Sequence, residues 1–330
     1  MNKIRTYSLA TILVSCLSFI LNAQNVNERK PEVYQDAVNR VGTTPPNNVS
    51  GKQDNNSGAT SASDAGAQRP VFLKTDALSL FAGYDAKITY RSNPLTLDGD
   101  LKQAKTGIWQ NSFYGGGSLN PIDTSIAVVT PYFGGSWTMS DYLNDNLSSL
   151  NDYASSAYGL LMIQHESGVG LRGGVSYANV RNNDTDSEDY SEFYPNIGAM
   201  KTYSIDADTI AIVDVSGGFH LTKADPLLGS NTQTLNSWDA AFSYGIRHNY
   251  WKLVISPNYR LTYKKYTEGG TINDGRKDVS HTLSIKIELP IIENATIGVN
   301  TAYTRRNSSG GGNDYKSLDA GAIIGINVRF

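Results

Sequence analysis

Residues 76–92 read DALSLFAGYDAKITYRS, and apolar and polar side chains alternate through this stretch. The positions from Leu78 to Tyr90 in steps of two are apolar or aromatic, and the positions between them are polar or glycine, apart from Phe81. Because successive side chains of a β-strand point to opposite faces, the pattern predicts a strand with one apolar and one polar face. Strands of soluble proteins average five or six residues, so a run this long is more typical of a tilted membrane strand.

The same alternation recurs to the end of the chain and predicts twelve strands. Their expected ranges are 76–92, 106–120, 124–141, 152–165, 168–182, 189–204, 208–223, 235–249, 252–267, 278–291, 295–307 and 316–330. The second, fourth and sixth are less regular, which leaves ten and fourteen strands as alternatives. The fold class that we expect is all-β, a transmembrane up-and-down antiparallel barrel of about 12 strands.

The connections between these strands alternate between short and long. Tight turns are expected at 121–123, 166–167, 206–207, 250–251 and 293–294, and long polar loops at 93–105, 141–151, 183–188, 224–233, 266–277 and 307–314. Outer-membrane barrels have short periplasmic turns and longer external loops. With an even strand count, this parity places both termini in the periplasm. Aromatic residues near strand ends predict two interfacial girdles: Tyr90, Trp109, Trp137, Tyr142, Tyr250, Trp251, Tyr263 and Tyr303. A soluble all-β sandwich or barrel is the alternative.

The first 70 residues predict two segments before the barrel. Lys3 and Arg5 precede an uncharged apolar run over 7–21, followed by a small-residue cleavage site at Ala23, as in a signal peptide over 1–23. A lipoprotein processing box ending at Cys16 is the alternative. Residues 24–70 are rich in Asn, Ser, Gly and Pro, and predict a disordered polar periplasmic segment. The barrel then covers 71–330.

Composition excludes several other classes of protein. The formal net charge of −3 gives no electrostatic basis for binding nucleic acid. A mean hydropathy of −0.34 rules out a bundle of transmembrane helices but suits a barrel, in which only alternate residues face lipid. The single cysteine excludes a disulfide framework within the chain.

The last predicted strand carries a family resemblance. An apolar stripe runs from Leu318 in steps of two to the terminal residue, and its last members are Ile326, Val328 and Phe330. This stripe resembles the C-terminal signature of Gram-negative outer-membrane proteins. The resemblance covers about residues 71–330 and implies that these three residues act as an assembly signal for the barrel-assembly machinery. It also implies outer-membrane lipid and lipopolysaccharide as the surroundings.

The polar faces of the strands predict a lumen that carries charges of both signs. The candidate pore-lining residues are Asp85, Lys87, Arg91, Arg172, Asp214, Asp239, Arg247, Arg260, Lys264, Lys286, Glu288, Asp319 and Arg329. Charged rings of this kind line selective channels, so a porin-like channel for small hydrophilic solutes, with a mild preference for anions, is the first hypothesis. A non-conducting barrel that binds partners through its outer loops is the second. An eight-stranded barrel is filled by side chains and a sixteen-stranded one is open, so twelve strands leave both hypotheses standing.

A third hypothesis is a lipid hydrolase. His165, Ser167 and Asn179 resemble the His-x-Ser…Asn arrangement of outer-membrane phospholipase A, itself a twelve-stranded barrel. That resemblance implies Ser167 as nucleophile, His165 as general base and Asn179 as the residue that orients the imidazole. Against it, Ser167 is followed by Gly168 where that family has Asn-Gly, and His165 and Ser167 fall in a predicted periplasmic turn. We therefore assign no catalytic residue, and we expect no metal site and no cofactor.

Overall fold

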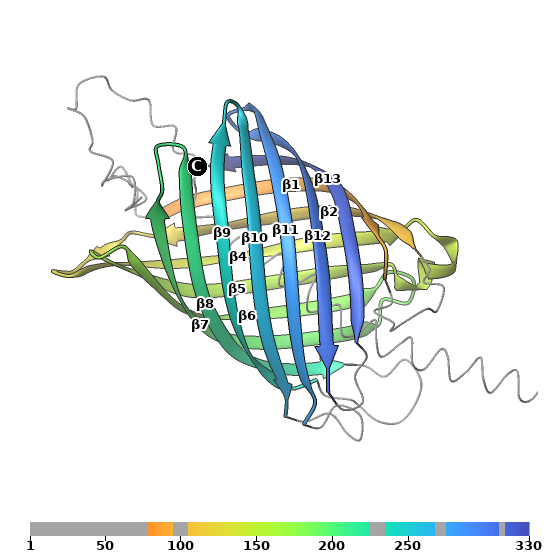
Figure 1. Ribbon diagram of the computed structural model, residues 1–330. Helices are drawn as coiled ribbons and strands as arrows, with labels where there is room; N and C mark the ends of the chain where they lie inside the picture. The colour runs from red at the N-terminus through yellow and green to blue at the C-terminus, as the bar shows by residue number, and fades with distance from the viewer. Residues whose placement is uncertain (1–77, 95–104, 225–234, 268–274, 310–313, 330) are drawn as a thin grey trace, which may run out of the picture.

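Twelve long antiparallel strands form a closed barrel in the computed structural model, which describes residues 78–94, 105–224, 235–267, 275–309 and 314–329 (Figure 1). The long strands are β1 (Leu78–Arg91), β2 (Thr106–Leu119), β4 (Ala127–Tyr142), β5 (Asp152–His165), β6 (Val169–Asn182), β7 (Glu188–Ser204), β8 (Thr209–Ala224), β9 (Ser237–Tyr250), β10 (Leu253–Tyr266), β11 (Lys277–Ile292), β12 (Ala295–Ser308) and β13 (Tyr315–Arg329). The predicted fold class and strand count are confirmed.

Consecutive strands pair with each other except β2 and β3 (Ile122–Asp123), and the pairings β1–β13 and β2–β4 complete the barrel. β1 pairs with β13 along eleven residues, from Phe81 opposite Arg329 to Arg91 opposite Asp319. β2 pairs directly with β4. The two-residue strand β3, which lies between them in the sequence, pairs with β4 and not with β2. Closure gives every long strand two partners, so the barrel has no exposed edge whose backbone groups would lack hydrogen bonds in lipid.

Short and long connections lie at opposite ends of the barrel. β5 and β6 are joined by three residues, β9 and β10 by two, and β11 and β12 by two. At the other end, the connection between β4 and β5 contains the 3₁₀ helix η1 (Asp145–Leu150), which Asn144 caps by accepting from the Asn146 amide at 3.1 Å. The sequence predicted only a loop there. No helix among the described residues is long and apolar enough to cross a membrane.

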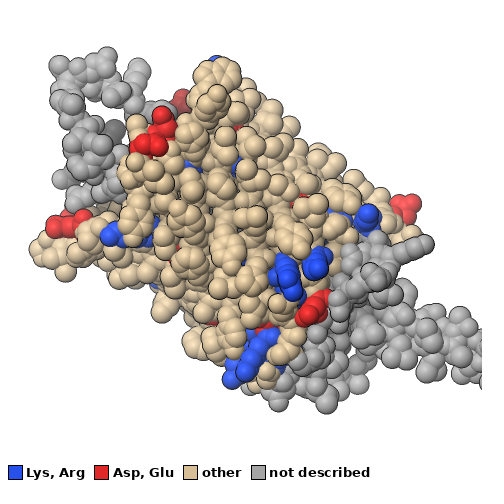
Figure 2. All heavy atoms as spheres, in the orientation of Figure 1, with Lys and Arg blue, Asp and Glu red and all other residues tan. Residues whose placement is uncertain are grey.

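Large apolar side chains cover the outside of the wall and are exposed. Examples from strands around the whole barrel are Ile88, Phe113, Phe133, Leu161, Leu171, Ile197, Val215, Phe219, Leu283, Val299 and Ile324. The middle of the face in Figure 2 is accordingly almost free of charged side chains. A water-soluble protein rarely exposes so continuous an apolar surface, whereas a barrel in a bilayer turns it to the lipid chains. The barrel is therefore a transmembrane one.

Most of the predicted girdle residues lie on this outer surface at the two ends of the strands. Trp109 and Tyr303 are exposed toward the long-loop end, and Tyr250 and Trp251 toward the short-turn end. The prediction is wrong for Tyr142. It lies opposite the buried Ile108, and residues directly opposite on paired strands share a face, so Tyr142 faces inward.

Several sequence-based expectations fall outside the described residues. They are the signal peptide (1–23), the polar segment (24–70), the first residues of the predicted barrel (71–77) and the terminal Phe330. Of the predicted assembly signal, Ile326 and Val328 are described, and both are exposed on the outer face of β13.

Candidate functional site: the charged lumen

The structure places the candidate pore-lining residues on the inner face of the barrel, with one exception. They alternate with exposed apolar residues of the same strands, as Lys87 does with Ile88, or they lie opposite an inward residue of the next strand, as Lys264 does with Asp239. The exception is Arg329, whose backbone pairs with Phe81 at the end of β13 and whose side chain lies outside the described residues.

One inward ion pair spans a whole strand. Arg172 on β6 reaches across β7 and donates to Asp214 on β8, with Nη2 to Oδ1 at 2.9 Å and a second contact from Nη1. The residue of β7 beneath it is Gly198, where a Cβ would lie 2.7 Å from the Arg172 guanidinium carbon. Glycine therefore allows the guanidinium to lie flat against the wall.

Two tyrosines whose side chains face the lumen, Tyr114 and Tyr158, also lie over glycines. A Cβ on Gly83 would lie 2.2 Å from the Tyr114 ring, and one on Gly134 would lie 2.4 Å from the Tyr158 hydroxyl oxygen. Each ring lies over a glycine of an adjacent strand. Long side chains thus lie along the wall, where they take less of the lumen than they would by projecting across it.

Charge is distributed unevenly around the lumen. On β2, β4 and β5 the inner face carries hydroxyl pairs, such as Ser112 with Thr138 at 2.9 Å and Ser136 with Ser156 at 2.7 Å. On β8 to β11 the inner face carries charged residues: Asp214, Asp239, Arg247, Arg260, Lys264, Lys286 and Glu288. The lumen therefore has a neutral side and a charged side.

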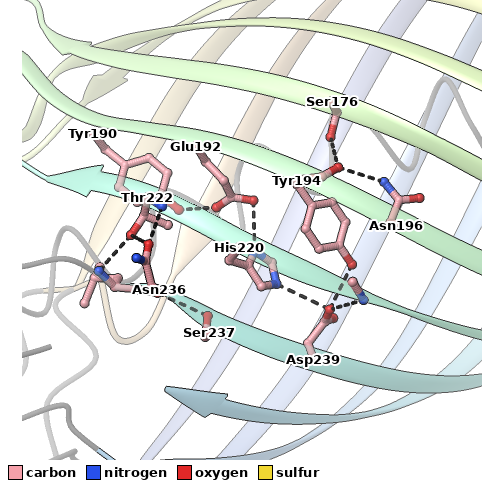
Figure 3. Close-up of polar contacts among 12 residues, drawn as sticks. Ser176, Tyr190, Glu192, Tyr194, Asn196, His220, Thr222, Asn236, Ser237 and Asp239 are labelled. Carbon is pink, nitrogen blue, oxygen red and sulfur yellow. Dashed lines mark hydrogen bonds and ion pairs between the residues drawn. The ribbon is translucent and has the colours of Figure 1, made fainter. Parts of the chain in front are cut away.

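A buried polar network ties β7, β8 and β9 together toward the long-loop end (Figure 3). His220 Nδ1 lies 2.9 Å from Glu192 Oε1, and His220 Nε2 lies 3.4 Å from Asp239 Oδ1. Each nitrogen of the imidazole therefore faces a carboxylate. The Tyr190 hydroxyl donates to Glu192, the Tyr194 hydroxyl donates to Asp239 at 2.9 Å, and the Tyr194 ring stacks on His220 with centroids 4.4 Å apart.

The contacts of this network indicate that it stabilises the barrel wall. Each of its side chains is buried, and each acid or hydroxyl is occupied by a neighbour in the same wall. Removing one partner of such a buried pair costs about 3–5 kcal/mol. Of its members, only Asp239 was among the predicted pore-lining residues, and Glu192, Tyr190 and Tyr194 were missed.

A second buried ionic cluster lies at the long-loop end of β11 and β12. Arg276 Nη2 is 2.7 Å from Asp278 Oδ2, and Arg306 Nη1 is 3.7 Å from the same oxygen. The Arg276 guanidinium also lies over the Tyr266 ring, 4.8 Å from its centroid. These contacts fix the first residues of β11 to the end of β10.

Along β11, the inward charged side chains become more exposed from the long-loop end toward the short-turn end. The Asp278 side chain is 4% exposed, whereas those of Lys286 and Glu288 are 46% and 29% exposed. Solvent therefore reaches the inner face of β11 most readily from the short-turn end.

On β9, β10 and β11, basic groups outnumber their acidic partners from the middle of the barrel to the short-turn end. Lys286 pairs with Glu288 at 2.7 Å. Arg260 donates to the Thr262 hydroxyl at 3.3 Å, and within the described chain no ion pair includes Arg260 or Arg247. Two arginines on adjacent strands thus leave positive charge in the lumen.

The residues of the hydrolase hypothesis are only partly brought together. His165 Nδ1 and Ser167 Oγ lie 2.8 Å apart in the exposed turn between β5 and β6. Asn179 lies opposite Ser155, ten residues along β6 from the first residue of that strand, or about 33 Å at 3.3 Å per residue. The chain therefore does not place Asn179 where it could orient His165. In the part of the chain that the structure describes, no group of three His, Cys, Asp or Glu residues is positioned to hold a metal ion.

A closed antiparallel barrel with an apolar outside and a polar inside, with short turns at one end and long loops at the other, is the architecture of the bacterial outer membrane. The chain is an outer-membrane β-barrel.

Comparisons with known proteins give similar solved structures but no family. No protein-family model and no curated protein matches the sequence. An outer-membrane channel from Pseudomonas putida F1 is 10% identical, with 77% of this chain and 97% of that chain covered and a TM-score of 0.46. The translocator domain of the autotransporter NalP from Neisseria meningitidis is 11% identical, with 80% and 91% covered and a TM-score of 0.42. Identities this low carry no information about function.

Proposed function

We propose that this barrel is a passive channel for small hydrophilic solutes, with a preference for anions, and that both its termini lie in the periplasm. The observation that carries the proposal is the excess of positive charge on β9 and β10, where Arg247 and Arg260 face the lumen with no ion pair among the described residues. Fixed charges in a pore attract counter-ions and repel ions of the same sign.

The flattened lining supports an open path. Arg172 and the inward tyrosines lie over glycines of the wall, and Arg172 is neutralised by Asp214. Solutes in the lumen would therefore meet a smooth wall on which the remaining charge is mainly basic. Passive diffusion through the lumen needs no catalytic nucleophile, metal or cofactor.

The test is planar-bilayer conductance of the refolded mature chain, with ion selectivity from the reversal potential in a salt gradient. The Arg247→Glu, Arg260→Glu double variant should shift selectivity toward cations. A matched control is Lys201→Glu, Lys252→Glu, which makes the same change in charge outside the lumen at the short-turn end. Equal selectivity in the two double variants would contradict the proposed role of the arginines.

The second candidate function is a non-conducting barrel that acts through its outer loops. It is favoured by the burial of the inward side chains toward the long-loop end, where Glu192, His220 and Asp278 are almost inaccessible. A folded, heat-modifiable protein that inserts into bilayers without conducting would favour this candidate over the channel.

The orientation has its own test. Cys16 lies in the predicted signal peptide, and the rest of the sequence contains no cysteine, so a single introduced cysteine can be labelled selectively. Asn146→Cys in the β4–β5 connection should react with an impermeant maleimide on intact cells, and Asp208→Cys in the β7–β8 turn should not. The reverse pattern would show that the barrel is inserted the other way round.

A further inference from the structure

Basic residues gather on the outer face of four adjacent strands, close to the long-loop end. The outward positions of β10 to β13 pass from apolar residues near the short turns to a basic group near the long loops. The five residues of this group, the outer basic cluster, are Lys265, Lys277, His281, Arg305 and Lys316. Figure 2 shows blue side chains on this part of the face, toward the lower right, beyond the apolar middle.

The register places basic residues directly opposite one another. Lys265 lies opposite Lys277 on β10 and β11, and Arg305 lies opposite both His281 on β11 and Lys316 on β13. Directly opposed residues on paired strands have Cβ atoms about 4.5–5.5 Å apart, and like charges in that position destabilise the sheet. A row of such pairs therefore has an electrostatic cost unless an anion lies among them.

Acidic side chains of the described residues form no ion pair with this cluster. No ion pair among them includes Lys265, Lys277, Arg305 or Lys316. The nearby Asp314 accepts a hydrogen bond from the Ser308 backbone amide at 2.6 Å, which holds the end of β12. Asp278 faces the lumen, where it binds Arg276.

A surface hollow lies beside the outer basic cluster. Its volume is about 370 Å³, and its lining residues are Tyr259, His281, Leu283, Tyr303, Arg305 and Asn307. The Tyr259 hydroxyl and His281 Nδ1 lie 2.8 Å apart, and Arg305 Nε donates to Asn307 Oδ1 at 3.3 Å. The hollow is thus apolar and aromatic toward the middle of the membrane, and basic toward the long loops.

We propose that the outer basic cluster and this hollow bind lipopolysaccharide of the outer leaflet, with the phosphate of its lipid A against Arg305 and Lys316 and an acyl chain along Leu283 and Tyr303. The inference rests on the proposed orientation, in which the long loops are external. Arginine binds phosphate through parallel N–H donors, and lysine binds it as a point charge. A phosphorylated glycolipid is the molecule at this depth that offers both the anion and the acyl chain.

Binding is tested on the refolded mature chain in detergent by native mass spectrometry, with titration of bis-phosphorylated lipid A. The probes for comparison are dephosphorylated lipid A, phosphatidylglycerol and inorganic phosphate. Each basic residue near a membrane surface contributes about 1 kcal/mol toward an anionic lipid, so Arg305→Gln, Lys316→Gln should weaken lipid A binding by about 30-fold. The matched control Lys201→Gln, Lys252→Gln removes two cations at the opposite end and should bind like the parent chain.

Stability without lipid gives a second readout, independent of binding. The Arg305→Gln, Lys316→Gln variant should fold and be about as stable as the parent in detergent, since it relieves like-charge repulsion and loses only the exposed hydrogen bond from Arg305 to Asn307. Lipid A should stabilise the parent chain more than the variant. Equal affinity for the two forms of lipid A, tighter binding of phosphatidylglycerol, or equal effects of the two double variants would each overturn the proposal. Conductance of the same preparations tests the proposed channel by itself, so failure of lipid A binding can be distinguished from failure of the channel.

Discussion

Neutralising Glu192 on β7 should destabilise the barrel, although the change from Glu to Gln keeps the shape of the side chain. Glu192 is 2% exposed and accepts hydrogen bonds from His220 and from Tyr190. Hydrogen bonds to a charged group contribute about 1.5–3 kcal/mol and those between neutral groups about 0.5–1.5 kcal/mol. Two bonds that change from the first kind to the second give an expected loss of about 2–3 kcal/mol in the free energy of unfolding.

The assay is equilibrium urea unfolding of the protein in phospholipid vesicles, followed by the fluorescence of its four tryptophans. Glu188→Gln is the matched control on the same strand. The Glu188 side chain is 31% exposed and lies 4.0 Å from Lys223, a weak surface pair whose loss should cost less than about 1 kcal/mol. If Glu192→Gln lowers the free energy of unfolding no more than Glu188→Gln does, the buried network does not hold β7 to β8.

Two further predictions concern a glycine of the barrel wall and a carboxyl group in a turn. Gly218→Ala should destabilise the barrel by about 1–3 kcal/mol in the same unfolding assay, because its Cβ would lie 2.5 Å from a backbone oxygen of β7, whereas Gly159→Ala, with no atom within 4 Å, should be neutral. The pKa of Asp206 in the β7–β8 turn is lowered by the backbone amide of Asp208, so its titration midpoint by NMR should fall below 3.8, the ordinary pKa of an aspartate. The turn should keep this stabilising contact above the ordinary pKa of the carboxyl and lose it only as the pH falls through the lowered value, and a midpoint at or above 3.8 would contradict this.

The strands could be predicted closely because their signal is local. In β13, Leu318, Ile324 and Ile326 alternate with small or polar residues, and the structure gives a strand over Tyr315–Arg329 with those side chains outside. Lipid on one side of a wall one residue thick imposes this period of two on every strand. Turns and loops interrupt the pattern, and so the strand ends were predicted to within three residues.

The buried network could not be predicted because both faces of β7 are mixed. Tyr190 and Tyr194 occupy inward positions next to the outward Phe193, so hydrophobicity does not separate the two sets. A register shift between β6 and β7 at Val180 and Arg181 interrupts the pairing as well. The contacts of Glu192 with β8 depend on register between strands, which a single sequence does not specify.

The same limit applies to the outer basic cluster. Lys277, Arg305 and Lys316 are separated by long stretches of sequence, and nothing in their spacing brings them together. Only the pairing of β11, β12 and β13 places these charges side by side on the outer face.

The proposed lumen conducts, and it prefers anions because of Arg247 and Arg260. Single-channel recording of the refolded chain from Gln24 to Phe330, in a salt gradient, tests this proposal most directly. We expect stable open steps with anion selectivity, and a shift toward cations in the Arg247→Glu, Arg260→Glu variant. A folded barrel that inserts without conducting, or a channel whose selectivity is unchanged by that variant, would contradict it.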